Sequence, residues 1–145
     1  MIALRPKSGG PCWGAKWSPD MAKVLIVEDN PANMKLATFL LQSAGHTVFS
    51  ATDAEAGLTM ARGEQPDLIL MDIQLPGMDG LEATALLKRD DATRDIPVIA
   101  LTALAMKGDE ERIRAAGCDG YIAKPLAYRD FLAIISAQLV AAPPL

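Results

Sequence analysis

The sequence contains few of the residues that redox and transition-metal sites use. It has two cysteines, Cys12 and Cys118, and a single histidine, His46. The cysteines lie far apart and form no CxxC pair, so we expect two reduced thiols of a cytoplasmic protein rather than a disulfide or a cysteine metal site. One histidine excludes a histidine metal cluster. His46 follows Gly45 in a predicted helix-to-strand turn, and we expect it to be solvated at the surface.

Long apolar segments are also missing. No apolar run approaches the roughly 20 residues needed to cross a bilayer, so we expect no membrane span. Residues 1–20 lack the apolar core of a secretory signal. This stretch is rich in glycine and proline, and we predict a disordered extension over residues 1–21 and a short tail over 141–145. Met21 directly precedes the first strand-like run and is a candidate translation start.

Positive charge is scarce outside the first residues. Lysine and arginine number 14 against 18 aspartates and glutamates, giving a net charge of −4. Residues 1–20 carry a local charge of +2, so the remainder carries −6. Because nucleic-acid binding depends on lysine and arginine that neutralise phosphates, we do not expect DNA or RNA as a partner. The chain has 145 residues, half of them apolar, which is typical of one globular domain.

Five apolar runs predict strands. Residues 24–27, 68–71 and 98–101 are continuously apolar, which is typical of strands buried on both faces of a parallel sheet. Residues 47–51 and 120–123 alternate more strongly, and we expect these two strands nearer the sheet edges.

Helical segments separate the strands. Apolar residues at helical spacing, with glycine or proline beyond them, predict five helices: Asn33 to Ala44, Ala54 to Arg62, Leu81 to Arg89, Met106 to Ala116 and Ala127 to Val140. Repeated βα units with right-handed crossovers place helices on both faces of one sheet. We therefore predict one α/β domain over residues 22–140, a flavodoxin-like (βα)5 three-layer sandwich. Its parallel five-stranded sheet is predicted to have the order 2-1-3-4-5.

Charged and polar residues stand at the carboxyl ends of the predicted strands, where such folds place their ligand crevice. They are Glu28 and Asp29 after the first strand, Asp72 after the third, Thr102 after the fourth and Lys124 after the fifth. Each has an ordinary structural interpretation as a helix cap, turn former, strand-end hydroxyl or edge lysine. Their joint occurrence at one edge favours a single site.

The residue types of this site define its chemistry. Clustered carboxylates without cysteine or histidine suit Mg²⁺, with Mn²⁺ as the alternative ion. A carboxylate beside Mg²⁺ can attack phosphorus and form an aspartyl phosphate. An ammonium such as Lys124 and a hydroxyl such as Thr102 stabilise the negative charge of that transition state. We therefore predict an acid pair, an acceptor aspartate, a hydroxyl and a lysine acting together.

Four motifs in order resemble the receiver domain of two-component response regulators. They are residues 24–30, 66–80, 100–103 and the Lys124-Pro125 pair, and the resemblance covers about residues 22–140. The stretch 102–112 is most similar to single-domain regulators of the DivK type and is also similar to receivers of hybrid histidine kinases. The resemblance implies a single-domain response regulator in a phosphorelay. A histidine kinase or histidine phosphotransfer protein would supply the phosphoryl group, and no turnover of an external substrate is expected.

The resemblance also implies roles for the acidic residues. Asp72 matches the phosphoacceptor. Asp29 matches a direct Mg²⁺ ligand, and Glu28 matches the second acidic residue, which acts through a metal-bound water. The backbone carbonyl of Gln74 matches the remaining protein ligand. The implied metal site is therefore made by Glu28, Asp29, Asp72 and Gln74.

Further residues match the phosphate contacts and the switch. Thr102 and Lys124 match the hydroxyl and the ammonium that contact the phosphate, and the bond before Pro125 is expected to be cis. Tyr121 matches the switch aromatic. Our hypothesis is that phosphorylation draws Thr102 inward and lets Tyr121 rotate, which reshapes the face of the fourth helix, fifth strand and fifth helix. We expect a downstream protein to bind that face, with the chain itself a monomer or weak dimer.

Other functions remain open from the residues alone. A small phosphohydrolase passing through an aspartyl phosphate is one alternative, but such enzymes often carry a second aspartate where this chain has Gln74, and an amide cannot take a proton from water. A receiver fragment of a hybrid histidine kinase is another. A flavin module is disfavoured because residues 28–31 are acidic instead of rich in serine, threonine and glycine. We expect no DNA-binding output domain after Val140, and the sequence has no GxxxxGK[ST] motif for ATP.

Overall fold

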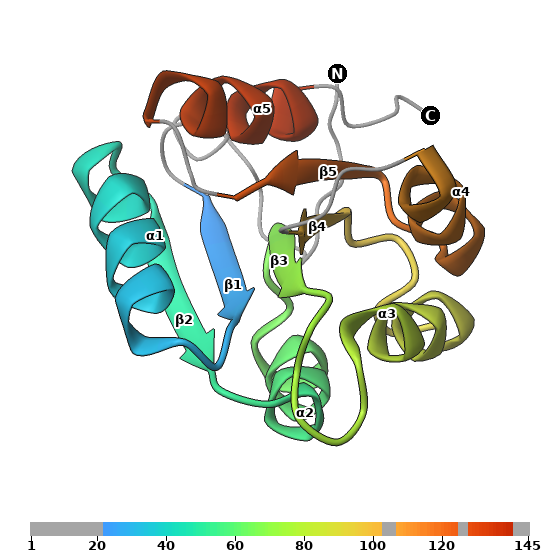
Figure 1. Ribbon diagram of the computed structural model, residues 1–145. Helices are drawn as coiled ribbons and strands as arrows, with labels where there is room; N and C mark the ends of the chain where they lie inside the picture. The colour runs from blue at the N-terminus through green and yellow to red at the C-terminus, as the bar shows by residue number, and fades with distance from the viewer. Residues whose placement is uncertain (1–21, 103–106, 125–127, 141–145) are drawn as a thin grey trace.

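The structure, a computed structural model, describes residues 22–102, 107–124 and 128–140 (Figure 1). The predicted extension over residues 1–21, the tail over 141–145 and the predicted cis bond at Pro125 lie outside the described residues.

Strands and helices alternate along the described chain. The elements are β1 (Lys23–Val27), α1 (Pro31–Ser43), β2 (Thr47–Ala51), α2 (Ala54–Glu64), β3 (Leu68–Asp72), α3 (Gly80–Arg89), β4 (Val98–Thr102), α4 (Lys107–Ala116), β5 (Gly120–Ala123) and α5 (Tyr128–Val140). The strands form one parallel sheet in the order β2-β1-β3-β4-β5. The predicted α/β fold class and strand order are confirmed.

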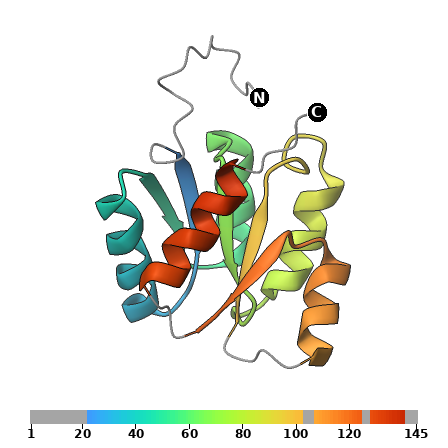
Figure 2. The same ribbon diagram turned by 90° about the horizontal axis from the view of Figure 1, so that it is seen from above.

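Helices cover both faces of this sheet. One apolar cluster joins α2 and α3 to alternate residues of β1, β3 and β4. A second cluster joins α1 and α5 to the residues between them, and Figure 2 shows α5 in red running across that face. Every residue of β3 and β4 is buried, whereas β2 and β5 are partly exposed. The prediction of central and edge strands from their apolar patterns is therefore confirmed.

Helix α1 begins earlier than predicted. It starts at Pro31 rather than at Asn33, because Asn30 is its N-cap and accepts hydrogen bonds from the backbone N–H groups of Ala32 and Asn33 at 2.9 and 3.1 Å. Asparagine at the cap followed by proline at the first helical position is a favoured helix start. The helix therefore begins directly beside the acidic pair.

His46 is buried, so the prediction of a solvated surface histidine is wrong. Its side chain is 5% exposed, and its Nδ1 accepts a hydrogen bond from the backbone N–H of Ala22 at 3.2 Å. Gly45, with a φ of 97°, reverses the chain after α1. The backbone N–H of His46 then bonds to the Leu41 carbonyl at 3.1 Å, which turns the imidazole under the amino ends of β1 and β2.

Among the described helices, none combines the length and the apolar character that crossing a bilayer requires.

Candidate functional site

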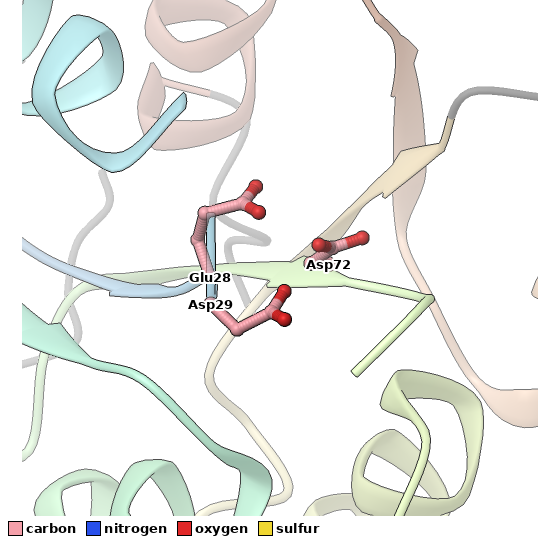
Figure 3. A group of neighbouring side chains, drawn as sticks. All are labelled: Glu28, Asp29 and Asp72. Carbon is pink, nitrogen blue, oxygen red and sulfur yellow. The ribbon is translucent and has the colours of Figure 1, made fainter. Parts of the chain in front are cut away.

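Three acidic side chains meet at the carboxyl ends of β1 and β3. Glu28 and Asp29 extend from the end of β1 toward Asp72 at the end of β3 (Figure 3). One carboxylate oxygen from each lies within 4.8 Å of the other two. Glu28 and Asp72 are only 1% and 3% exposed, whereas Asp29 is exposed. The cluster is therefore a largely buried group of negative charges with one side open to solvent.

Strand register explains why the acids meet. Val27 of β1 pairs with Met71 of β3, so the next residues, Glu28 and Asp72, stand at the same level of the sheet. The backbone N–H of Glu28 still bonds to the Ala51 carbonyl of β2 at 3.0 Å. Two buried carboxylates at one level repel each other and lose hydration, which a fold tolerates only with compensating positive charge.

Lys124 supplies part of that compensation. Its Nζ lies 3.1 Å from Glu28 Oε1 and 3.2 Å from Asp72 Oδ2, and its backbone N–H bonds to the Thr102 carbonyl at 2.8 Å. Three carboxylates and one ammonium leave a formal charge of −2 in this cluster. A divalent cation would neutralise that charge.

The buried acid of the pair is electrostatically unfavourable as an anion. Burial raises the pKa of Glu28, the neighbouring Asp72 carboxyl raises it further, and Lys124 and the backbone N–H of Asn30 oppose the shift only in part. Glu28 Oε1 is buried and makes no hydrogen bond of good geometry, although the ammonium lies near it. An incompletely satisfied carboxylate oxygen among hard oxygen donors fits Mg²⁺.

The loop from β3 to α3 holds Asp72 in place. The backbone N–H of Gln74 donates to Asp72 Oδ1 at 3.0 Å, and the backbone N–H of Gly80 donates to the Ile73 carbonyl at 3.0 Å. A Cβ on Gly80 would lie 2.1 Å from the Asp72 carbonyl oxygen. Sequence reasoning missed this packing role of Gly80, because nothing in the local sequence shows how closely α3 approaches β3.

Thr102 and Tyr121 lie on the other side of the acceptor. Thr102 ends β4 and is 5% exposed. Tyr121 of β5 is half-buried, and its hydroxyl donates a hydrogen bond to Glu110 Oε2 of α4. A cleft of about 220 Å³ opens beside Thr102, lined by Ile73, Gln74, Asp79, Leu81, Thr102, Arg112 and Ile113. Glu110 was not singled out by the sequence, since the bond joins residues of different elements.

Comparison with known proteins agrees with this geometry. The response regulator receiver domain family matches residues 24–136, and the chain belongs to this family. It is therefore a receiver domain of two-component signalling.

One curated relative and two solved structures are similar to most of this chain. The chain is 53% identical over 116 residues to the polar-differentiation response regulator DivK of Brucella anthropi, covering 80% of this chain and 94% of that protein. Among solved structures, it is similar to the receiver domain of the sensor histidine kinase PA1611 of Pseudomonas aeruginosa PAO1, with 35% identity, a TM-score of 0.77 and coverage of 82% and 98%. That structure has a magnesium ion coordinated in its active site cleft. CheY4 of Vibrio cholerae matches with 28% identity, a TM-score of 0.76 and coverage of 79% and 96%.

Proposed function

We propose that Asp72 accepts a phosphoryl group from a phosphohistidine on a histidine kinase or histidine phosphotransfer protein, and that this protein signals as a DivK-like regulator in the cytoplasm. The observation that carries the proposal is the position of Asp72. Its carboxylate is held by the backbone N–H of Gln74 and lies 3.2 Å from Lys124 Nζ, beside a second buried acid. In this proposal the fixed carboxylate attacks phosphorus in line with the leaving nitrogen.

The metal in this proposal is Mg²⁺. Asp29 and Asp72 would bind it directly, Glu28 would act through a metal-bound water, and the Gln74 carbonyl would complete the protein ligands. When bound, the ion neutralises phosphoryl oxygens during transfer. The donor set supports it, since three carboxylates lie within one ion's reach and carry excess negative charge.

The chain's own residues perform the remaining steps. An Asp72 oxygen forms the new O–P bond while the P–N bond to the donor imidazole breaks and its electron pair returns to the imidazole nitrogen. The Lys124 ammonium stabilises the negative charge on the transferred group, and the Thr102 hydroxyl donates to a phosphoryl oxygen. Because Gln74 places an amide instead of a second carboxyl beside Asp72, we propose a persistent aspartyl phosphate and no turnover of external phosphoesters.

The output is a change in protein contacts. In this proposal Thr102 moves toward the phosphate and Tyr121 leaves its present position. The surface of α4, β5 and α5 then binds a downstream protein. The position of Tyr121 in β5, bonded to α4, supports this route.

The direct test is phosphotransfer to purified protein from a radiolabelled histidine phosphotransfer protein in Mg²⁺. We expect Asp72→Asn to lower labelling by about a thousandfold or more, because the nucleophile is lost. The matched control is Asp53→Asn. Asp53 caps α2 by accepting from the backbone N–H of Ala56 at 2.8 Å, and asparagine caps equally well. Labelling of Asp72→Asn at the wild-type level would overturn the proposal.

A further inference from the structure

The hydrogen bond between Tyr121 and Glu110 joins the last strand to α4. Tyr121 lies in β5 and donates its hydroxyl hydrogen to Glu110 Oε2, and both side chains are half-buried. Among the described side chains of α4, those of residues 110–116, Ile113 is the buried one. Since Ile113 is the one buried side chain among residues 110–116, a charge-assisted bond to the sheet contributes to the attachment of this part of α4.

The strand register places Tyr121 on the same face as Thr102. Tyr121 pairs with Ala100 of β4, and Thr102 pairs with Ala123 of β5. Alternate residues of a strand share a face, so Ala100 and Thr102 lie on one face of β4, next to Tyr121. Ala100 has a small side chain, and the sheet therefore offers little steric resistance between the ring of Tyr121 and Thr102.

An open space lies beside Thr102. The cleft of about 220 Å³ is lined by Thr102 on the sheet and by Arg112 and Ile113 on α4. Its volume is several times the roughly 30 Å³ that one water molecule occupies in the liquid. The Tyr121 hydroxyl is meanwhile held by a carboxylate of α4. The structure thus holds Tyr121 on α4, while open space lies beside Thr102.

We propose that Glu110 is a positioning residue that holds Tyr121 against α4 in the unphosphorylated protein and sets how readily the ring moves toward Thr102. The first half concerns the unmodified chain, whereas the second half rests on the proposed phosphorylation of Asp72. Moving the ring breaks the hydroxyl–carboxylate bond, so the strength of this bond biases the equilibrium toward the inactive arrangement.

The electrostatics at the tyrosine agree with a close contact. The hydrogen bond to Glu110 is the largest cause that raises the pKa of Tyr121, partial burial and the Glu110 charge add to it, and nearby Arg114 opposes the shift. A carboxylate stabilises the neutral phenol as a donor and disfavours a second negative charge beside it.

Three variants separate this contact from a general charge effect. Glu110→Ala removes the acceptor, and Glu110→Gln keeps an acceptor oxygen without the charge. Glu111→Ala is the matched control, because Glu111 is the next residue of the same helix, carries the same charge and is exposed. Circular dichroism melting confirms that each variant folds.

The first measurement needs no phosphate. The chain has two tyrosines, so fluorotyrosine incorporated into a Tyr128→Phe background reports Tyr121 alone by fluorine NMR. We expect Glu110→Ala to move the signal toward the position that wild type reaches with Mg²⁺ and beryllium fluoride, a phosphate mimic. Glu110→Gln is expected to keep most of the wild-type position, and Glu111→Ala all of it. Equal shifts in Glu110→Ala and Glu111→Ala would overturn the proposal.

The second measurement is the rate of phosphorylation by phosphoramidate. We expect Glu110→Ala to raise the rate about three- to tenfold, the range for losing one half-buried hydrogen bond of the inactive arrangement. The increase should vanish in a Tyr121→Phe background, because a double-mutant cycle isolates the pair. An increase that persists in that background contradicts the proposal. If no variant is phosphorylated, the proposed function fails, while the fluorine signal still decides whether Glu110 holds the ring.

Discussion

Helices α3 and α4 have ten residues each and contact each other beside the sheet (Figure 1), yet they are held very differently. Helix α3 buries Gly80, Ala83, Thr84 and Leu87. Among the described side chains of α4, Ile113 is the buried one. The difference predicts that the sheet holds α3 more firmly than the described part of α4.

Helices α3 and α4 also differ in their polar contacts. The Lys88 ammonium of α3 donates to the Ile96 carbonyl at 2.9 Å and lies 3.0 Å from Asp119 Oδ2. The Thr84 hydroxyl donates to the Gly80 carbonyl at 2.8 Å. Since Gly80 packs on the backbone of Asp72, these contacts fix the acceptor. Helix α4 instead contacts β5 through the hydrogen bond between Glu110 and Tyr121.

The largest expected effect comes from removing one buried side chain from each helix and comparing the losses in the free energy of unfolding. We expect Leu87→Ala to lower the free energy of unfolding by about 3 kcal/mol, as for other buried leucines. Ile113→Ala should cost less, about 2 kcal/mol, at the lower end for a buried isoleucine, because few of the other described side chains of α4 are buried and the helix can open locally. Urea unfolding measures both values. Leu36→Ala is the control, because Leu36 is an exposed leucine of α1, and equal costs in α3 and α4 would refute the contrast.

A smaller effect, on amide hydrogen exchange, tests the difference between α3 and α4 without mutation. In the unphosphorylated protein we expect backbone amides of α4 to exchange with solvent deuterium about tenfold faster than those of α3, because few buried contacts oppose local opening. Phosphorylation should change exchange in α4 and β5 more than in α3. Mass spectrometry of peptides from each helix gives the rates. Similar protection of both helices before phosphorylation would show that α4 is as firmly held as α3.

The smallest expected effect is on the melting temperature and comes from the charge of Glu28 in the acidic cluster beside α3. The pKa of Glu28 is raised above its ordinary value of 4.5, so its contribution to stability is complete below that value and is lost as pH rises through the folded-state pKa. Mg²⁺ favours the charged carboxylates. We therefore expect Mg²⁺ to raise the melting temperature by a few degrees near pH 7 and by less near pH 5.

Calorimetry with and without Mg²⁺ at both pH values checks this expectation. Glu28→Gln, which cannot ionise, is the control and should show a weaker pH dependence of the Mg²⁺ effect. A stabilisation by Mg²⁺ of the same size at both pH values would contradict the role assigned to Glu28.

Sequence reasoning succeeded where local pattern and sheet geometry decide the outcome. The apolar runs of β1, β3 and β4 identified the central strands, and the rule that ligands bind at strand carboxyl ends brought Asp72 and Lys124 to one place. Both depend on spacing along a strand, which the sequence states directly.

Contacts between separate elements could not be predicted in the same way. His46 is buried because the turn after α1 aims it at the Ala22 backbone, and Gly80 is required by the approach of α3 to β3. The bond of Glu110 to Tyr121 depends on how α4 lies against β5. The start of α1 is different, since Asn30 followed by Pro31 is a cap signal that the sequence itself shows, although the predicted helix began at Asn33.

The place of Lys124 has a mechanical consequence. Its ammonium sits almost midway between Glu28 and Asp72, and it directly follows β5, an edge strand with β4 as its one neighbour in the sheet. The proposed phosphorylation of Asp72 would change the charges that hold this ammonium. We expect a shift of Lys124 to displace the backbone of β5, so that Lys124 and Tyr121, three residues before it, move together.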